Sequence, residues 1–357
     1  MIGALAACQP PPTDEPDAAH TEQPAGKTQA EQQQASASEL ALAEEFSALA
    51  QGFSGTVGIA VRDLQSSRTI GFNSSEMLPQ QSVTKLWVAL TALDLVDQGK
   101  LELAERAVIG RDDLTLFHQP LRNVVSRQGR WVGDYGELME MALTGSDNTA
   151  NDALLRRAGG PQAVEAFLAR KRIAGVRFGS DERTKQSRIA GLEWDQSYSV
   201  KNRFYEARDA VPDSQRKAAF EGYLADPEDG ATASAMALAL ARLAEGELLS
   251  PSSTIIALNI LARTRSGPRR LKGGLPPGWQ IAHKTGTGQV YGREQSGYND
   301  VGILTSTDGR RYAVAVMIGR TSESFADRME LMQQVVRATA RYDAATYAGQ
   351  QNGEGSA

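Results

Sequence analysis

Two side chains able to perform nucleophilic chemistry, Ser82 and Lys85, stand three positions apart at the start of a strongly apolar run. Residues at i and i+3 share one face of a helix, so the Lys85 ammonium can reach the Ser82 hydroxyl. The N-terminus of a helix also favours the negative charge that develops on an attacking serine. A lysine whose pKa is lowered by burial and by neighbouring positive charge can accept the hydroxyl proton. The pair therefore predicts nucleophilic catalysis by Ser82 with Lys85 as its activating partner.

This Ser-x-x-Lys pattern is weak by itself, because Ser214 and Lys217 repeat it where a solvated helix face is the better interpretation. Two further motifs distinguish the first copy, namely Ser146-Asp147-Asn148, which begins 64 positions after Ser82, and Lys284-Thr285-Gly286 in a β-like segment. A Ser-His-Asp triad is disfavoured, since the chain has 3 histidines and no Gly-x-Ser-x-Gly elbow. No His/Cys/Asp cluster has metal-ligand spacing, so neither a metal nor another cofactor is expected.

In this order the three motifs resemble those of the class A serine β-lactamases, within the β-lactamase and penicillin-binding transpeptidase superfamily. The resemblance covers roughly Phe46 to Ala340. Beyond the motifs it rests on Asn151 at the end of the second motif, on Gly159-Gly160-Pro161, on the segment from Gly246 to Ser250 and on the segment from Leu275 to Trp279. It implies a monomeric enzyme that hydrolyses small β-lactam molecules through an acyl-enzyme.

The resemblance also implies a role for each matching residue. Ser82 would attack the lactam carbonyl, and the backbone N–H groups of Ser82 and Thr287 would form the oxyanion hole. Ser146 would relay a proton to the leaving nitrogen, bridged to Lys85 and Lys284. Asn148 would hold Lys85 and the side-chain amide of the substrate. An ammonium and hydroxyls complement a carboxylate, so the segment from Lys284 through Thr285 and Gly286 to Thr287 is expected to bind that of the substrate.

Glu182 is expected to activate the water that releases the acyl group, because it lies 36 positions after Ser146, the family spacing. The neighbourhood departs from the family pattern. Ser180 stands where the family usually has an arginine, and Gln186 stands where an asparagine normally helps to hold the water. Glu193 in the same loop is a second candidate, and a loop without any functional base is the third interpretation.

The presence of this base separates three possible functions. A serine β-lactamase needs it for rapid deacylation, whereas a penicillin-binding DD-peptidase-like enzyme shares the three motifs but releases its adduct slowly. A non-catalytic penicillin sensor or cell-wall-binding module is the remaining alternative. The complete set of motif residues argues against a module that only binds, because binding alone requires no such set.

A positively charged anchor for the substrate carboxylate is expected at Arg270, which lies 14 residues before Lys284, where some family members carry an arginine. Arg269, Arg293 and Arg328 are alternatives. The alternative interpretation of Arg270 is that it belongs to a solvated basic loop without a binding role.

About 40 residues follow Gln186 before the family pattern resumes, and we treat 187–228 as a family-atypical insertion. Its aromatic residues predict an ordered flap with a small core of its own. A packing role is favoured over a lid or a partner surface above the site. Phe117 and His118 are minor candidates for an aromatic edge of the cleft.

The elements that must position these residues follow an α/β pattern. Strands are predicted at 56–61, 69–72, 279–284, 300–305 and 312–318, and helices at 39–51, 86–96 and 325–342. Asp308-Gly309 predicts a hairpin between the last two strands. The predicted fold class is α/β of the α+β sandwich type. Both chain ends form a mixed, mostly antiparallel sheet, which terminal helices flank and into which an all-helical subdomain is inserted, as in the serine β-lactamase/DD-peptidase-like fold.

The chain ends suggest export. Residues 1–8 resemble a truncated lipoprotein signal that ends at Cys8, the single cysteine, although a chance cysteine is the alternative. Residues 9–37 are too polar to form a core and are expected to be a disordered tether to a catalytic domain at 38–345, and 346–357 a disordered tail. A periplasmic, membrane-anchored protein is therefore predicted. The interspersed charges, with a net charge of −5, indicate no nucleic-acid partner.

Overall fold

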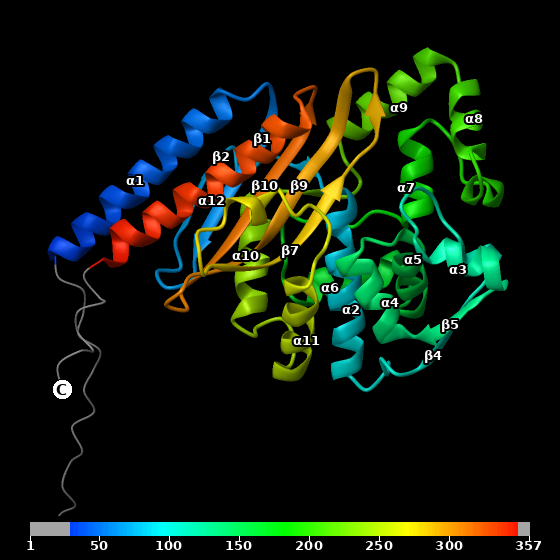
Figure 1. The fold of residues 1–357 in the computed structure, drawn as a ribbon, viewed down its shortest axis with the longest axis horizontal. Helices are drawn as coiled ribbons and strands as arrows, with labels where there is room; N and C mark the ends of the chain where they lie inside the picture. Colours follow the sequence, from blue (N-terminus) through cyan, green and yellow to red (C-terminus); the bar gives the residue numbers. More distant parts are fainter. Residues whose placement is uncertain (1–28, 349–357) are drawn as a thin grey trace, which may run out of the picture.

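The computed structural model describes residues 29–348, which form layers around one sheet (Figure 1). The sheet has the strand order β2-β1-β10-β9-β7. Its strands are β1 (Gly55–Asp63), β2 (Thr69–Phe72), β7 (Gln280–Thr287), β9 (Glu294–Thr305) and β10 (Arg311–Thr321), and β8 (Val290–Tyr291) pairs with β9. β1 pairs with β10 from Gly55↔Thr321 to Asp63↔Tyr312, which confirms that both chain ends build the sheet. All of its ladders are antiparallel, so the sheet is not mixed.

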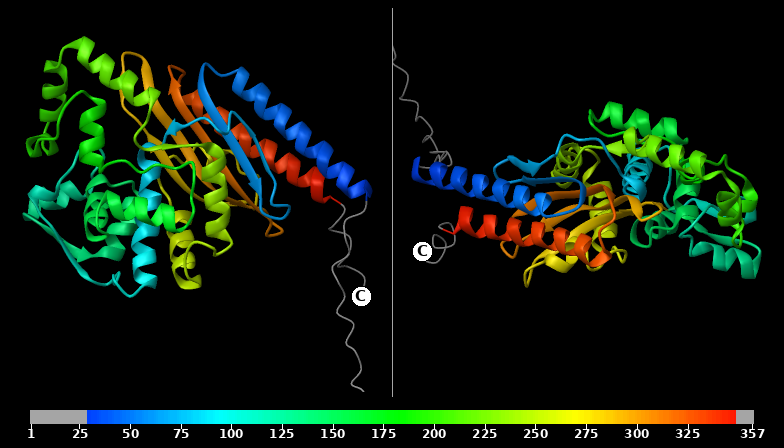
Figure 2. Two further views of the ribbon diagram at one scale, coloured as in Figure 1. Left: turned by 180° about the vertical axis from the view of Figure 1, so that it is seen from behind. Right: turned by 90° about the horizontal axis from the view of Figure 1, so that it is seen from above.

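The two terminal helices, α1 (Gln29–Gln51) and α12 (Phe325–Tyr347), lie side by side across one face of the sheet (Figures 1 and 2). The apolar side chains that predicted them point inward. Leu42, Phe46, Met332 and Val336 are all buried in one core cluster with the strands. Burying a side chain of this kind contributes about 1.5–3 kcal/mol, so both helices are attached to the sheet by apolar area.

The opposite face of the sheet is covered by α10 (Ala233–Ala244) and α11 (Pro251–Ala262), and α2 (Lys85–Asp97) packs against α11. Every residue of α2 from Lys85 to Asp94 is buried. A helix that is apolar on all sides must lie inside a protein, which explains why α2 runs through the interior. The nucleophile segment is therefore the beginning of a helix that is buried over most of its length.

The inserted region contains α3 (Leu121–Gln128), α4 (Tyr135–Thr144), α5 (Asn148–Arg157) and α6 (Pro161–Arg170). We expected this region to be all-helical, and this expectation was wrong, because β4 (Arg106–Ile109) pairs with β5 (Trp131–Asp134). Ala107 and Ile109 are buried while Val108 is exposed, and this alternation favours a strand. A second short ladder joins β3 (Leu78–Pro79) to β6 (Gly230–Ala231). The 3₁₀ turns are η1 (Gln81–Thr84), η2 (Arg111–Asp113), η3 (Gln196–Ser199) and η4 (Leu271–Gly274).

The atypical insertion contains the end of α7 (Glu182–Ile189), η3, α8 (Arg203–Ala210) and α9 (Asp213–Ala225). Its predicted small core is present, because Phe204 is buried against Leu116 and Ala190, with Phe117 and Tyr198 packed beside them. The rings of Phe117 and Phe204 meet edge to face at 5.0 Å between centroids. The second Ser-x-x-Lys copy lies exposed on α9, as expected for a solvated helix face.

The chain ends are more helical than predicted. Residues 29–37, which we assigned to the tether, belong to α1, since their alanine, glutamine and glutamate are good helix formers. At the other end α12 continues to Tyr347, whose hydroxyl donates to buried Asp63 at 2.6 Å, so the tail does not begin at 346. Cys8 and the remainder of the tether and tail lie outside the described residues. Within residues 29–348, no helix has the length and apolar character needed to cross a membrane.

Candidate active site

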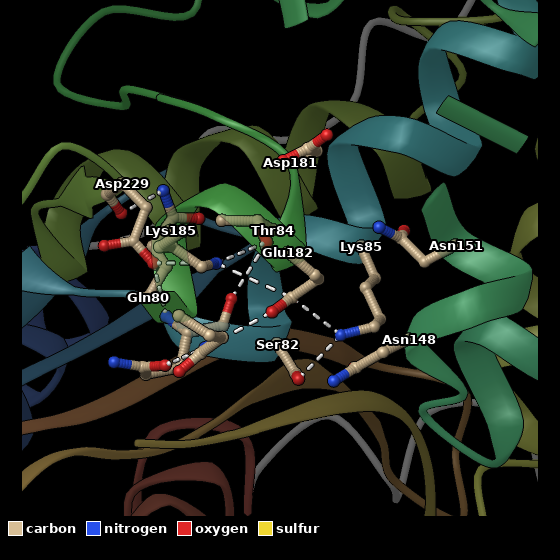
Figure 3. Close-up of polar contacts among 12 residues, drawn as sticks. Gln80, Ser82, Thr84, Lys85, Asn148, Asn151, Asp181, Glu182, Lys185 and Asp229 are labelled. Carbon is tan, nitrogen blue, oxygen red and sulfur yellow. Dashed lines mark hydrogen bonds and ion pairs between the residues drawn. The ribbon is translucent and has the colours of Figure 1, made fainter. Parts of the chain in front are cut away.

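Ser82 and Lys85 meet where the short turn η1 continues into α2. The Nζ atom of Lys85 donates a hydrogen bond to Ser82 Oγ at 2.7 Å, as the i, i+3 spacing predicts. Lys85 is fully buried, whereas Ser82 is half-buried. Ser82 is thus partly exposed, whereas the ammonium that contacts it is shielded from water. Figure 3 shows the hydrogen bond between the two side chains.

Strand β7 approaches the nucleophile segment closely because Gly286 has no side chain. A Cβ atom at this position would lie 2.3 Å from the carbonyl oxygen of Gln80. Asn299, opposite Gly286 in the β7–β9 ladder, donates Nδ2 to the carbonyls of Pro79 and Gln80 at 2.7 and 3.0 Å. The edge of the sheet and the residues just before Ser82 are therefore held in contact.

The second motif faces the third across the site. Lys284 Nζ donates to Ser146 Oγ at 3.1 Å and to the carbonyl of Thr285 at 2.9 Å. Ser146 has a φ of 58°, a left-handed conformation that is uncommon outside glycine. Asp147 caps α5 by accepting the backbone N–H of Ala150 at 3.0 Å, so the strained serine is fixed from its C-terminal side.

Asn148 is the first residue of α5 and is buried. Its Nδ2 donates to the carbonyl of Leu116 at 2.9 Å, and its backbone N–H donates to the carbonyl of His118 at 2.9 Å. Figure 3 places its side chain next to Ser82 and Lys85. The structure therefore brings Asn148 to the site, tied to the loop that also carries Phe117.

Glu182 lies between Lys85 and Lys185 (Figure 3). It begins α7, whose N-cap Asp181 accepts the backbone N–H of Thr184 at 2.9 Å. Lys85 Nζ donates to Glu182 Oε1 at 2.8 Å, and both side chains are at most 2% exposed. Glu193, the second candidate, is exposed. Of the two acids, only Glu182 touches the Ser82–Lys85 pair.

Gln186 contacts the carboxylate itself. Its Nε2 donates to Glu182 Oε2 at 3.2 Å and to Gln81 Oε1 at 3.0 Å. Gln289, which follows β7, donates Nε2 to Gln186 Oε1 at 2.9 Å and so fixes the orientation of the amide. Gln186 lies one helical turn after Glu182 on α7. Its side chain is one methylene longer than that of asparagine, and its amide contacts the Glu182 carboxylate.

Opposing effects set the charges of the three central groups. Burial would raise the pKa of Glu182, but the ammonium groups of Lys185 and Lys85 outweigh it and hold this pKa well below its ordinary value. Burial lowers the pKa of Lys85 despite its contact with Glu182. The pKa of Lys284 is well below its ordinary value because of burial and the positive charges of Lys85 and Arg270. The site therefore favours an ionised Glu182 and lysines able to lose a proton.

Of the four candidate arginines, Arg270 contacts the third motif. Its guanidinium donates to Thr287 Oγ1 at 2.5 Å and to the carbonyl of Gly286 at 2.9 Å, and it stacks over the Tyr298 ring at 3.7 Å. Arg269 and Arg293 are exposed. Arg328 lies over the same Tyr298 ring and donates to Gln295. Arg270 thus places buried positive charge beside the hydroxyl of Thr287.

A cavity of about 310 Å³ adjoins the site between the insertion and the end of β7. It is lined by Phe117, Gln186, Tyr205, Arg208, Thr287, Gly288, Gln289 and Val290. Phe117 therefore lines a hollow next to the site, as suggested, whereas the side chain of His118 is exposed. The insertion packs through its own core and also forms one wall of this cavity through α8.

Several residues of the site were not found from the sequence. Lys185, Asp229 and Tyr223 form a buried polar group beside Glu182, and Gln81 connects it to the nucleophile segment. The i, i+3 spacing of Glu182 and Lys185 was the one available signal. Among the described residues no group of three His, Cys, Asp or Glu side chains could hold a metal ion.

Comparison with known proteins places this geometry in a family context. A model described as "Beta-lactamase enzyme family" matches residues 41–342. The extended-spectrum beta-lactamase PER-1 from Pseudomonas aeruginosa is 26% identical over 303 residues, which cover 85% of this chain and 87% of that protein. A beta-lactamase structure from Chitinophaga pinensis superposes with a TM-score of 0.69 at 25% identity, covering 85% of this chain and 99% of the other. An ancestral class A beta-lactamase is 29% identical, with a TM-score of 0.66 and coverages of 84% and 99%.

Proposed function

The chain belongs to the beta-lactamase enzyme family and is a hydrolase of the class A type, and on this premise we propose that it hydrolyses the amide bond of penicillins and cephalosporins through an acyl-enzyme on Ser82. One observation carries the proposal. Lys85 Nζ lies 2.7 Å from the Ser82 hydroxyl and 2.8 Å from the carboxylate of Glu182. A nucleophile, a proton acceptor and a second base are thereby connected in one chain of hydrogen bonds.

In the acylation step, Ser82 Oγ attacks the lactam carbonyl carbon and its proton passes to Lys85 Nζ. The lowered pKa of Lys85 supports this transfer, because a neutral amine is needed to accept the proton. The lactam C–N bond then breaks, and the nitrogen takes a proton from the hydroxyl of Ser146, which Lys284 contacts at 3.1 Å. Ser146 regains a proton from Lys85, so the proton that left Ser82 ends on the nitrogen and Lys85 is neutral again. The N–H groups of Ser82 and Thr287 are proposed to stabilise the oxyanion.

Substrate binding is assigned to the edge of β7. An anionic carboxylate on the substrate would meet the hydroxyls of Thr285 and Thr287 and the ammonium of Lys284. Arg270 would reinforce the positive field through its contact with Thr287 Oγ1 at 2.5 Å. Asn148 would bind the side-chain amide of the substrate from the opposite wall.

In the deacylation step, Glu182 takes a proton from a water molecule, whose oxygen attacks the acyl carbonyl carbon. The ester bond to Ser82 Oγ breaks, and the serine takes up the proton that Glu182 returns through Lys85, which contacts both groups. The low pKa of Glu182 supports its being ionised at neutral pH, as a base must be. This step distinguishes the proposed β-lactamase from a penicillin-binding DD-peptidase-like enzyme.

Intact-mass measurement with benzylpenicillin tests the proposal. We expect a transient penicilloyl adduct and hydrolysed penicillin far beyond one equivalent, and Ser82→Ala should show neither. An adduct that forms on the wild-type protein and persists would indicate a penicillin-binding protein instead. No adduct and no turnover would favour the non-catalytic sensor.

Glu182→Gln is expected to separate the two chemical steps. The variant keeps the shape of the side chain but cannot accept a proton, so the penicilloyl adduct should accumulate. Removing a general base typically costs 10²–10⁴-fold in rate. Acylation should persist, because loss of the neighbouring carboxylate lowers the pKa of Lys85 further. An adduct lifetime equal to that of the wild type would remove Glu182 from the mechanism.

We also propose that the protein is a periplasmic lipoprotein that acts as a monomer, with Cys8 as the lipidated residue. The lipobox-like Leu5-Ala6-Ala7-Cys8 supports this, although it lies outside the described residues. Radiolabelled palmitate should enter the protein when it is exported in a bacterial host. Cys8→Ala should prevent the labelling, and a labelled variant would contradict the proposal.

A further inference from the structure

Lys185 is a buried cation that the proposed mechanism does not use. It lies one helical turn after Glu182 on α7, and its side chain is 1% exposed. Its Nζ is 3.6 Å from Glu182 Oε1, 3.2 Å from Asp229 Oδ2 and 3.5 Å from Thr84 Oγ1. Figure 3 shows Glu182 between Lys185 on one side and Lys85 on the other.

Such a position is costly unless the charge is compensated. Removing an ammonium group from water costs several kcal/mol, which only close and well-oriented anions recover. Asp229 is completely buried and supplies one of the two nearby carboxylates. The pairing is therefore built into the interior and differs from the exposed ion pairs on the surface, which contribute little.

Asp229 is itself fixed to the segment that carries the nucleophile. Its Oδ2 accepts the backbone N–H of Gln81 at 2.9 Å, and its Oδ1 accepts the hydroxyl of Tyr223 at 2.8 Å. Gln81 Nε2 in turn donates to the same Tyr223 oxygen at 2.7 Å. Tyr223 belongs to α9 of the insertion, so the insertion contributes directly to this network.

Lys185 also connects the two ends of the atypical loop. Glu182 and Lys185 lie shortly before the atypical insertion at 187–228, and Asp229 immediately follows it. Lys185 approaches both acids within 3.6 Å, and it thereby closes the base of a long loop. Some 40 residues lie between the two ends of this loop. If the ends were not held together, the larger number of loop conformations would make the position of the Glu182 carboxylate less well defined.

We propose that Lys185 is a positioning residue that holds the Glu182 carboxylate toward Lys85 and fastens both ends of the atypical loop to the segment before Ser82. The inference rests on the proposed β-lactamase function. Lys185 has no contact with Ser82 and acts through Glu182, and for this reason it is not assigned a catalytic role.

The charge of Lys185 also affects the pH range of the base. Glu182 faces Lys85 from α2, Asp152 from α5 and Lys284 from β7, while Asp229 and Glu228 face Lys185. Asp152 accepts the backbone N–H of Glu182 at 3.1 Å, and its pKa is raised to about 6 by burial and by the acids Asp181 and Glu182. Loss of Lys185 removes one of two stabilising cations, so the pKa of Glu182 rises and the acid limb of deacylation moves to higher pH.

Lys185→Met tests the inference because methionine keeps an unbranched side chain of similar size without the charge. Acylation and deacylation of benzylpenicillin are measured separately by intact mass and stopped flow between pH 4 and 9. Deacylation should slow by roughly 10- to 100-fold, the size expected for a misplaced catalytic group, while acylation changes much less. The acid limb should shift upward, and Lys185→Arg should recover most of the rate.

The controls separate positioning from folding. Lys171→Met removes another lysine paired with a buried aspartate, at 2.9 Å from Asp94, and should leave both steps unchanged. Lys185→Met leaves the carboxylate of Asp229 without its cation, and a double variant that adds Asp229→Asn removes this unpaired charge. Circular dichroism shows whether each variant is folded. A folded Lys185→Met variant with wild-type deacylation and an unchanged acid limb would overturn the inference. Failure of both Lys185 variants to fold would also overturn it, whereas absence of wild-type turnover would contradict the proposed function instead.

Discussion

The reactivity of individual residues in this site depends on their pKa values, which burial and neighbouring charges set. Lys85 and Lys284 are buried with positive neighbours, and the pKa of each is lowered. Glu182 is buried too, but two ammonium groups reverse the effect of burial and its pKa falls. The site therefore contains lysines that can release protons and a carboxylate that stays ionised.

The lowered pKa of Glu182 affects how the rate of hydrolysis depends on pH. A carboxyl whose pKa is lowered in the folded protein stays ionised as the pH falls below its ordinary value of about 4.3. The acid limb of kcat under deacylation-limited conditions should therefore lie at or below this value. By the same linkage, the stability that ionised Glu182 contributes is present above about pH 4.3 and is lost as the pH falls further. Steady-state hydrolysis between pH 3.5 and 8 measures the limb, and a limb near pH 6 would assign it to Asp152 instead.

At the scale of elements, the contact between β7 and η1 decides whether the third motif reaches the nucleophile. Gly286→Ala would place a Cβ 2.3 Å from the carbonyl oxygen of Gln80 and force the strand away. Overpacking of this kind costs about 1–3 kcal/mol. We expect a lower melting temperature and a marked loss of kcat/KM for benzylpenicillin.

The matched control for this variant is Gly222→Ala in α9, where an added Cβ meets nothing within 4 Å. Alanine replaces glycine in a helix with a gain of about 0.5–1 kcal/mol, so this protein should be slightly more stable and fully active. Equal activity of the two variants would show that the close approach of β7 is not needed.

The insertion is a second element whose packing can be tested. Phe204 is 2% exposed and contacts three other aromatic rings, those of Phe117, Tyr198 and Tyr205. Phe204→Ala should reduce the stability of this region by about 3–5 kcal/mol, the usual cost of emptying a buried phenylalanine site. Hydrogen exchange of residues 187–228 should accelerate, whereas Ile255→Ala, at a site that is 59% exposed, should change little. Unchanged protection of the insertion would mean that its small core does not hold it.

At the scale of the whole molecule, a buried carboxylate connects the first strand to the last helix. Asp63 at the end of β1 is 0% exposed and accepts the hydroxyls of Tyr342 and Tyr347 at 3.1 and 2.6 Å. It also accepts Ser66 Oγ at 2.8 Å. The contact joins two chain ends that are separated by almost the entire sequence.

Asp63→Ala should therefore weaken the whole fold. Each buried hydroxyl left without its acceptor costs about 1–3 kcal/mol, and we expect the free energy of unfolding to fall by about 3 kcal/mol in urea titration. Asp112→Ala, at an exposed position in η2, should stay within about 0.5 kcal/mol of the wild type. A loss of similar size in both variants would contradict the role of Asp63.

The sequence by itself determined the reactive pair and the main helices and strands near both chain ends. The period of apolar residues predicted α12 and the strands of both ends, because one buried face imposes that period. The spacing of Ser82 and Lys85 predicted their contact, because the geometry of one helical turn is local. The order of the three motifs indicated the family before any spatial contact was known.

The tertiary structure alone decided between the alternative site residues and added side chains that the sequence had not indicated. Two acids in one loop, Glu182 and Glu193, were equally reactive by type, and only the packing of α7 buried the first beside Lys85. The pairing of Lys185 with Asp229 spans the whole insertion, and no local pattern encodes such a contact. The pKa of Glu182 depends on burial and on charges from several elements, and these distances are fixed by the folded chain and not by the order of its residues.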